Sequence, residues 1–248
     1  MTAAFALQDR VLISPRHLAG MGEDYLGDVG GPLIQLFKWH VENGPSAGHV
    51  VISSPDHSVD LDVNPSEPRG RLWTITHHEA DWRIQLSQHT PVEAVAAVAQ
   101  ALPQTLGDNR YRDRIPLIDM PLENIAAANG WKAEQGAFTS PDGHCTLINT
   151  PDNEQPWAFS HSVYEALGTE WEATFSRRAP LLNQFFAHIS TSEPVQRRFG
   201  ELNETVREFF LADSLPHTVI TPTRGTALGP AVHHAVTQIA QSAPRLRR

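Results

Sequence analysis

The nine residues SSPDHSVDL at 53–61 recur 86 positions later as TSPDGHCTL at 139–147. A second stretch, DWRIQLSQHTP at 81–91, recurs 89 positions later as EWEATFSRRAP at 170–180. Two tryptophan pairs keep the same order, Trp73 with Ile75 and Trp157 with Phe159. The spacing drifts by a few residues, as expected of a duplicated unit that has accepted loop insertions. The sequence therefore predicts two similar units in tandem.

Each unit is predicted to contain a helix, four strands and a second helix. In the first unit, residues 32–44 have apolar side chains at helical spacing and end at Asn-Gly. Thr90 and Glu93 flank Pro91 as in a capping box, which opens a helix to about residue 106. Between the two helices lie four alternating segments separated by turn residues, at 49–53, 58–63, 71–76 and 82–87.

The second unit repeats this order, with a short helix over 121–131 and a helix after Pro180. Its four strands are expected near 137–140, 144–150, 157–163 and 171–176. A further amphipathic helix is expected over 195–209 and a last one over 231–239. We expect an α+β fold of two four-stranded antiparallel sheets, each backed by a helix, plus a C-terminal helical tail. The predicted divisions are an extension (1–29), the first unit (30–106), a linker (107–119), the second unit (120–212) and a tail (213–248).

The composition is that of an ordinary globular protein, with 40% apolar and 19% charged residues among 248. No apolar run approaches the roughly 20 residues that span a bilayer, and the first residues do not resemble a signal peptide. Cys145 is the single cysteine, which excludes an intramolecular disulfide. We therefore expect a cytoplasmic protein that does not bind membranes.

The formal net charge of −9 is spread over both units. Residues 1–106 carry 6 basic and 12 acidic groups, and residues 107–212 carry 9 and 15. Only residues 213–248 are net basic, with 4 basic groups and 1 acidic group. A field of this sign repels polyphosphates, so nucleic-acid binding would require a local basic patch.

Several motifs together resemble the domain of unknown function 317 family. They are SPRHLAG at 14–20, the two SPD turns, the paired tryptophans and the helix opened by Thr-Pro. The resemblance covers about residues 10–212, and His57 stands where the first turn of the family usually has glycine. It implies a bacterial protein with tandem domains and assigns no catalytic residue. The predicted unit order is also similar to the Whirly and PUR-alpha class of single-strand nucleic-acid binders.

No motif identifies an enzyme, a metal site or a cofactor site. Gly44–Gly48 matches G-x-S-x-G, but a helix precedes Ser46 and a strand follows it, the reverse of a nucleophile elbow. Adjacent histidines such as His77 and His78 point to opposite faces of a strand, and no partner completes a metal site. We therefore expect a protein that is not an enzyme and that needs no cofactor.

The two faces of the predicted sheets differ. Trp73, Trp82 and Trp171 alternate in phase with apolar residues, which favours core packing over base stacking. The opposite face of the second unit is nearly neutral. Two interpretations stay open for it, an ordinary exposed face and an interface with another unit, chain or ligand. The candidate interface residues are Thr146, Ile148, Ala158, Ser160, Thr174 and Ser176.

Arginines gather where strands are expected to end, a placement suited to bidentate contacts with phosphate. Solvated loop arginines are the plainer interpretation. The candidate nucleic-acid-binding residues are Arg177, Arg178, Arg69, Arg71 and Arg83. Two hypotheses follow: a non-enzymatic binder of single-stranded nucleic acid, or a protein-interaction module that forms a homo-oligomer or binds another protein through the neutral sheet face.

Overall fold

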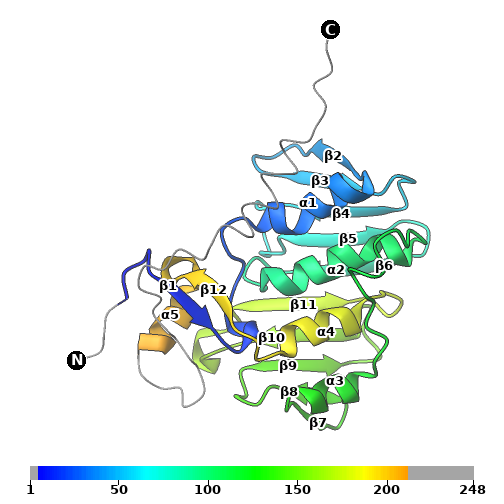
Figure 1. The fold of residues 1–248 in the computed structure, drawn as a ribbon. Helices are drawn as coiled ribbons and strands as arrows, with labels where there is room; N and C mark the ends of the chain where they lie inside the picture. The colour runs from blue at the N-terminus through cyan, green and yellow to red at the C-terminus, as the bar shows by residue number, and fades with distance from the viewer. Residues whose placement is uncertain (1–4, 212–248) are drawn as a thin grey trace.

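Ten strands form one antiparallel sheet in the computed structural model, which describes residues 5–211 (Figure 1). The strand order is β2-β3-β4-β5-β6-β11-β10-β9-β8-β7, so the first unit fills one half of the sheet and the second unit the other. The first half contains β2 (His40–Asn43), β3 (Val50–Ser53), β4 (Val59–Val63), β5 (Trp73–His77) and β6 (Trp82–Leu86). The second half contains β7 (Lys132–Glu134), β8 (Ala137–Thr139), β9 (Cys145–Asn149), β10 (Trp157–His161) and β11 (Trp171–Phe175).

The two halves join where β6 pairs with β11, a junction that we call the seam. Across the seam Thr174 lies opposite Gln85, and these are equivalent residues of the duplication, 89 positions apart. Trp73 and Trp157 occupy β5 and β10, the fourth strand of each half, as the duplication predicts. An internal pseudo-twofold axis therefore passes between Gln85 and Thr174.

Hydrogen bonds at the seam occur in pairs related by this axis. The Ser87 amide donates to the Glu172 carbonyl and the Ser176 amide donates to the Arg83 carbonyl, both at 2.9 Å. The Arg83 amide donates to Ser176 Oγ and the Glu172 amide donates to Ser87 Oγ, both at 2.8 Å. Because Ser87 is equivalent to Ser176 and Arg83 to Glu172, each bond occurs twice in the seam.

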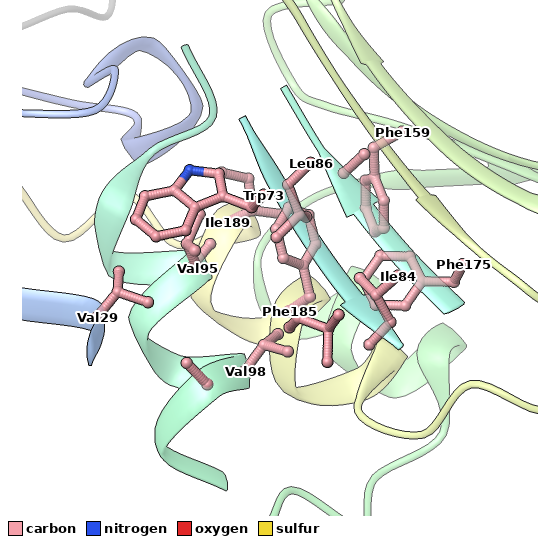
Figure 2. Close-up of a cluster of buried hydrophobic side chains, with 14 of the residues drawn as sticks. Val29, Trp73, Ile84, Leu86, Val95, Val98, Phe159, Phe175, Phe185 and Ile189 are labelled. Carbon is pink, nitrogen blue, oxygen red and sulfur yellow. The ribbon is translucent and has the colours of Figure 1, made fainter. Parts of the chain in front are cut away.

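Four helices cover one face of the sheet: α1 (Tyr25–Phe37), α2 (Val92–Thr105), α3 (Leu122–Ala128) and α4 (Leu182–Ser190) (Figure 1). One core runs across both halves beneath them. Figure 2 shows Ile84 of β6 next to Phe175 of β11, with Phe185 of α4 and Val98 of α2 on the helix side of the cluster. Each fully buried aliphatic or aromatic side chain contributes about 1.5–3 kcal/mol, so the seam belongs to the core.

A second, smaller layer stands beside the sheet. It pairs β1 (Arg10–Ile13) with β12 (Val195–Arg198) and adds α5 (Glu204–Leu211). Its own core includes Val11, Ile13, Phe199 and Val206. Short 3-10 turns η1 (Arg16–Leu18), η2 (Glu165–Leu167) and η3 (Phe199–Glu201) complete the described elements. The N-terminal extension is thereby tied to the end of the second unit.

The expected four-stranded sheets are wrong: each unit supplies five strands, and the two units share one sheet. The missed strands are the outermost ones, β2 and β7, which are three or four residues long and exposed at every position. A strand with no buried face lacks the alternation that marks the others. The first helix also lies nearer the N-terminus than the predicted range of 32–44. It begins at Tyr25 and ends at Phe37, with Pro32 in its interior.

Two further predictions are corrected. The capping box is absent, because Pro91 is the N-cap of α2 and the Glu93 carboxylate pairs with Arg197 at 2.6 Å instead. The single helix expected over 195–209 is divided into β12, η3 and α5, since residues 195–198 pair with β1. The tail helix predicted over 231–239 lies outside the described residues. Within residues 5–211 no helix is long and apolar enough to cross a membrane.

Candidate functional site

The sheet face opposite the helices, which we call the open face, is polar and carries no helix among the described residues. Cross-strand neighbours along its central row are Asp62, Thr74, Gln85, Thr174 and Ala158. The tryptophans point the other way, and Trp73, Trp82 and Trp171 are at most 6% exposed. The described part of the open face therefore offers hydrogen-bonding groups and charges rather than an aromatic stacking surface.

Three of the five predicted arginines meet in one cavity beside the seam. Arg83 projects from β6, while Arg177 and Arg178 follow β11 in the turn to α4. With Thr76 and Ser176 they line a cavity of about 280 Å³, which we call the arginine pocket. Residues 94 positions apart thus form one site because β6 and β11 pair.

The electrostatic balance of the arginine pocket is mixed. Asp81 and Glu154 also line it, so three guanidinium groups face two carboxylates. Arg177 donates a hydrogen bond to the Pro151 carbonyl. Between residues 5 and 211, no hydrogen bond or ion pair engages the guanidinium of Arg83 or Arg178. These two groups are therefore available to an anionic ligand.

A polar network covers the pseudo-twofold axis. Gln85 Oε1 accepts from Arg71 Nη1 at 3.1 Å and from Gln155 Nε2 at 3.0 Å. Thr174 Oγ1 donates to Gln155 Oε1 at 2.9 Å. Arg71 and Gln155 are themselves equivalent positions, two residues before Trp73 and Trp157. The network holds the β9–β10 loop against the seam and shapes one wall of the arginine pocket.

The other candidate residues are spread over the face. Arg69 is exposed in the β4–β5 loop, where only its amide is held, by Glu67 at 2.8 Å. Thr146, Ile148, Ala158, Ser160 and Thr174 lie together on the open face of β9, β10 and β11. Thr146 and Ser160 share a hydrogen bond of 2.9 Å between their hydroxyl oxygens. Ser176 lies apart from this group, at the seam, as a wall of the arginine pocket.

The first half of the open face is more acidic, and histidines accompany its carboxylates. Asp60 lies 2.8 Å from His78, and Asp62 lies 3.0 Å from His49. Ser46 of the G-x-S-x-G pattern is in the loop before β3. Among the described residues no hydrogen bond joins its hydroxyl to His49, so Ser46, His49 and Asp62 do not form a connected triad.

A buried cluster of titratable groups lies on the helix side of the second half. His17 Nε2 is 2.8 Å from Asp142 Oδ2, and His161 Nδ1 is 3.3 Å from Glu170 Oε2. The two imidazole rings are 5.3 Å apart, and His161 stacks on Trp171. Burial lowers the pKa of His161 to about 4, so His161 is neutral at pH 7. Burial raises the pKa of Asp142, but hydrogen bonds from His17 and Ser140 outweigh it and hold that pKa well below its usual range.

Sequence reasoning missed this cluster and the role of Gln155. A signal for the cluster exists, since His17 belongs to SPRHLAG and Asp142 to the second SPD turn. Gln155 could have been found only by aligning it with Arg71. Across residues 5–211 no three His, Cys, Asp or Glu side chains gather as metal ligands.

The comparisons with known proteins agree with the duplication. Residues 53–105 and 139–195 each match the SPDY family, described as a domain of unknown function (DUF317). No curated protein and no solved structure matches the chain, so similarity to the Whirly and PUR-alpha class is not confirmed. The two matched segments contain the SPD turns, the strands that form the seam and the helices α2 and α4 that follow those strands. Two segments of the chain therefore match the DUF317 domain, consistent with two copies in tandem.

Proposed function

We propose that the protein is a non-enzymatic binding module that holds single-stranded nucleic acid on the open face, with backbone phosphates at the arginines of the arginine pocket. The observation that carries this proposal is the convergence of Arg83, Arg177 and Arg178 from the two units. Guanidinium groups bind phosphate through paired hydrogen bonds. Uncovered antiparallel sheets also serve as nucleic-acid surfaces in other folds, and this analogy supports the proposal.

The remaining charges favour a single strand over a duplex. A duplex carries one charge per about 1.7 Å of axis, so it would lay phosphates along Asp60 and Asp62. A single strand can bend so that only a few phosphates approach the protein. Because no tryptophan stacks on the open face, contacts with phosphate and sugar must supply most of the affinity. We therefore expect weak, salt-sensitive binding with little sequence preference.

The test is an anisotropy titration of a fluorescein-labelled oligothymidylate at several salt concentrations. The double variant Arg177→Ala/Arg178→Ala should weaken binding and lower the salt slope by about 1.4, at about 0.7 per lost phosphate contact. Arg112→Ala/Arg114→Ala removes the same charge from exposed positions in the linker and should change the slope little. Absence of wild-type binding at low salt, or equal losses in both double variants, would refute the proposal.

A second candidate is assembly through the neutral half of the open face. Ala137, Ile148 and Ala158 are cross-strand neighbours there, and Ile148 is 45% exposed. An apolar row on an uncovered sheet favours contact with another protein or a second copy. Sedimentation velocity over a range of concentrations tests it, with Ile148→Arg expected to dissociate the oligomer. A wild-type protein that stays monomeric throughout would remove the homo-oligomer.

A further inference from the structure

The arginine pocket has a counterpart on the other side of the pseudo-twofold axis. The duplication pairs Arg83 with Glu172, Arg177 with Gln88 and Arg178 with His89. We call Glu172, Gln88 and His89, with the backbone around them, the mirror site. Equivalent residues thus carry three potential cations on one side of the seam and one carboxylate on the other.

The mirror site is built on the same backbone frame. The Glu172 amide donates to Ser87 Oγ at 2.8 Å, as the Arg83 amide does to Ser176 Oγ. The Gln88 amide donates to the Gly70 carbonyl at 2.9 Å, which fixes the start of the β6–α2 turn. Gln88 and Glu172 are both exposed, as Arg177 and Arg83 are. The two sides therefore differ in side-chain chemistry far more than in backbone.

The side chains of the mirror site oppose an anion. Glu172 places a negative charge where Arg83 places a positive one, and Gln88 is neutral where Arg177 is charged. His89 is half-buried, and burial lowers its pKa, so it is an uncharged imidazole at neutral pH. A phosphate at this side would meet the Glu172 carboxylate with no arginine from these three positions to offset it. The nearby Arg71, which is the equivalent of Gln155, already donates to Gln85 on the axis at 3.1 Å.

We infer that the seam provides one anion-binding half-site instead of two. Each chain therefore takes one phosphodiester strand, on the Arg83 side of the axis. Glu172 determines this specificity, because its carboxylate closes the mirror site to phosphate. This inference rests on the proposed function. A ligand with twofold symmetry would present phosphates to both sides of the axis and lose half of its contacts. A single strand has no such symmetry and suits a one-sided site.

The test is to build the missing half-site and count phosphates. The double variant Gln88→Arg/Glu172→Arg gives the mirror site the charges found at Arg177 and Arg83. The matched control Gln35→Arg/Glu123→Arg makes the same change of net charge at exposed positions of α1 and α3, on the helix-covered face. Both variants and the wild type are titrated with fluorescein-labelled oligothymidylate at several salt concentrations. Circular dichroism confirms that each variant is folded.

We expect the mirror-site variant to steepen the salt slope by about 1.4, for two added phosphate contacts, and to bind more tightly than the control at the same salt. A mirror-site variant that matches the control overturns the inference while leaving the proposed function intact. A wild type that does not bind at all overturns both. Glu172→Gln alone should give a smaller gain, because it removes the repulsion without adding a cation.

Discussion

The two SPD turns show what the duplication kept and what it changed. In the first turn Ser54 Oγ donates to Asp56 at 2.6 Å and accepts from the Val59 amide at 3.0 Å. In the second turn the equivalent Ser140 makes the same two bonds, at 2.6 and 2.9 Å.

The difference lies in what each aspartate holds beyond its own turn. Asp142 uses its second oxygen to bind His17 of the N-terminal extension, whereas among the described residues Asp56 accepts hydrogen bonds only from Ser54 and Ser58. The aspartate of the turn therefore bonds only within its own turn in the first unit and anchors the N-terminal extension in the second. The seam repeats the pattern, with one backbone frame and opposite side chains. The duplicated residues build the scaffold, and the departures from duplication carry the specific contacts.

The largest effect is expected at the shared core. Phe175 is fully buried, 5.4 Å from Phe185 and 6.1 Å from Phe159, and its strand partner is Ile84 of the other unit. Phe175→Ala should cost about 3–5 kcal/mol of unfolding free energy, and Leu86→Ala about 2–5. In urea each variant should unfold in a single transition with a lower midpoint concentration, and circular dichroism and tryptophan fluorescence should give the same midpoint. Two separate transitions would show that the units fold independently.

The next effect is expected at His161, which is fully buried, whereas its equivalent in the first unit, His77, is only half-buried. Because burial lowers the pKa of His161 to about 4, the unfolded chain binds a proton below pH 6.5 that the folded protein binds only near pH 4. Stability should therefore fall by about 3 kcal/mol as pH drops from about 6.5 to about 4, the worth of about 2.5 pKa units.

Urea melts across this pH range test the prediction. His161→Gln should flatten the pH profile of the unfolding free energy. An unchanged profile in the His161 variant would contradict the assignment. An NMR titration of the wild-type imidazoles gives a second readout if that variant does not fold.

The smallest effect is expected at the residue that follows the aspartate of each SPD turn, His57 in the first and Gly143 in the second. His57 and Gly143 both have positive φ, 57° and 81°, a region that costs other residues roughly 1–2 kcal/mol relative to glycine. His57 stacks on His40 with rings 5.3 Å apart, which offsets part of that cost. His57→Gly should therefore be neutral or stabilise by up to about 1 kcal/mol, and Gly143→His should destabilise by about 1. Urea unfolding measures both, and opposite signs would contradict this account.

The spacing of apolar residues in the sequence predicted the strands that bury one face, and it predicted the helices α2 and α4. In β4, for example, Val59, Leu61 and Val63 are buried while Asp60 and Asp62 are not. It did not predict β2 and β7, because edge strands bury neither face. It also did not predict that β6 pairs with β11, since alternation identifies the buried face of a strand but not its neighbour.

The candidate site was predictable in part. The arginines were found from their positions at strand ends, but their convergence depends on the seam. Arg71 was grouped with them, yet it lies on the axis, where it donates to Gln85. Gln155 sits in a loop with no pattern of its own, and its role follows only from its equivalence to Arg71.

The central claim is that nucleic acid lies on one side of the seam, and cross-linking tests it most directly. A single-stranded oligonucleotide containing 4-thiouridine is bound at low salt, irradiated and digested, and the linked peptides are identified by mass spectrometry. We predict cross-links in the peptides that contain Arg83 and Arg177–Arg178, with few in the segment around Gln88. Cross-links confined to helices α1–α4, equal yields on both sides of the axis, or none would contradict the claim.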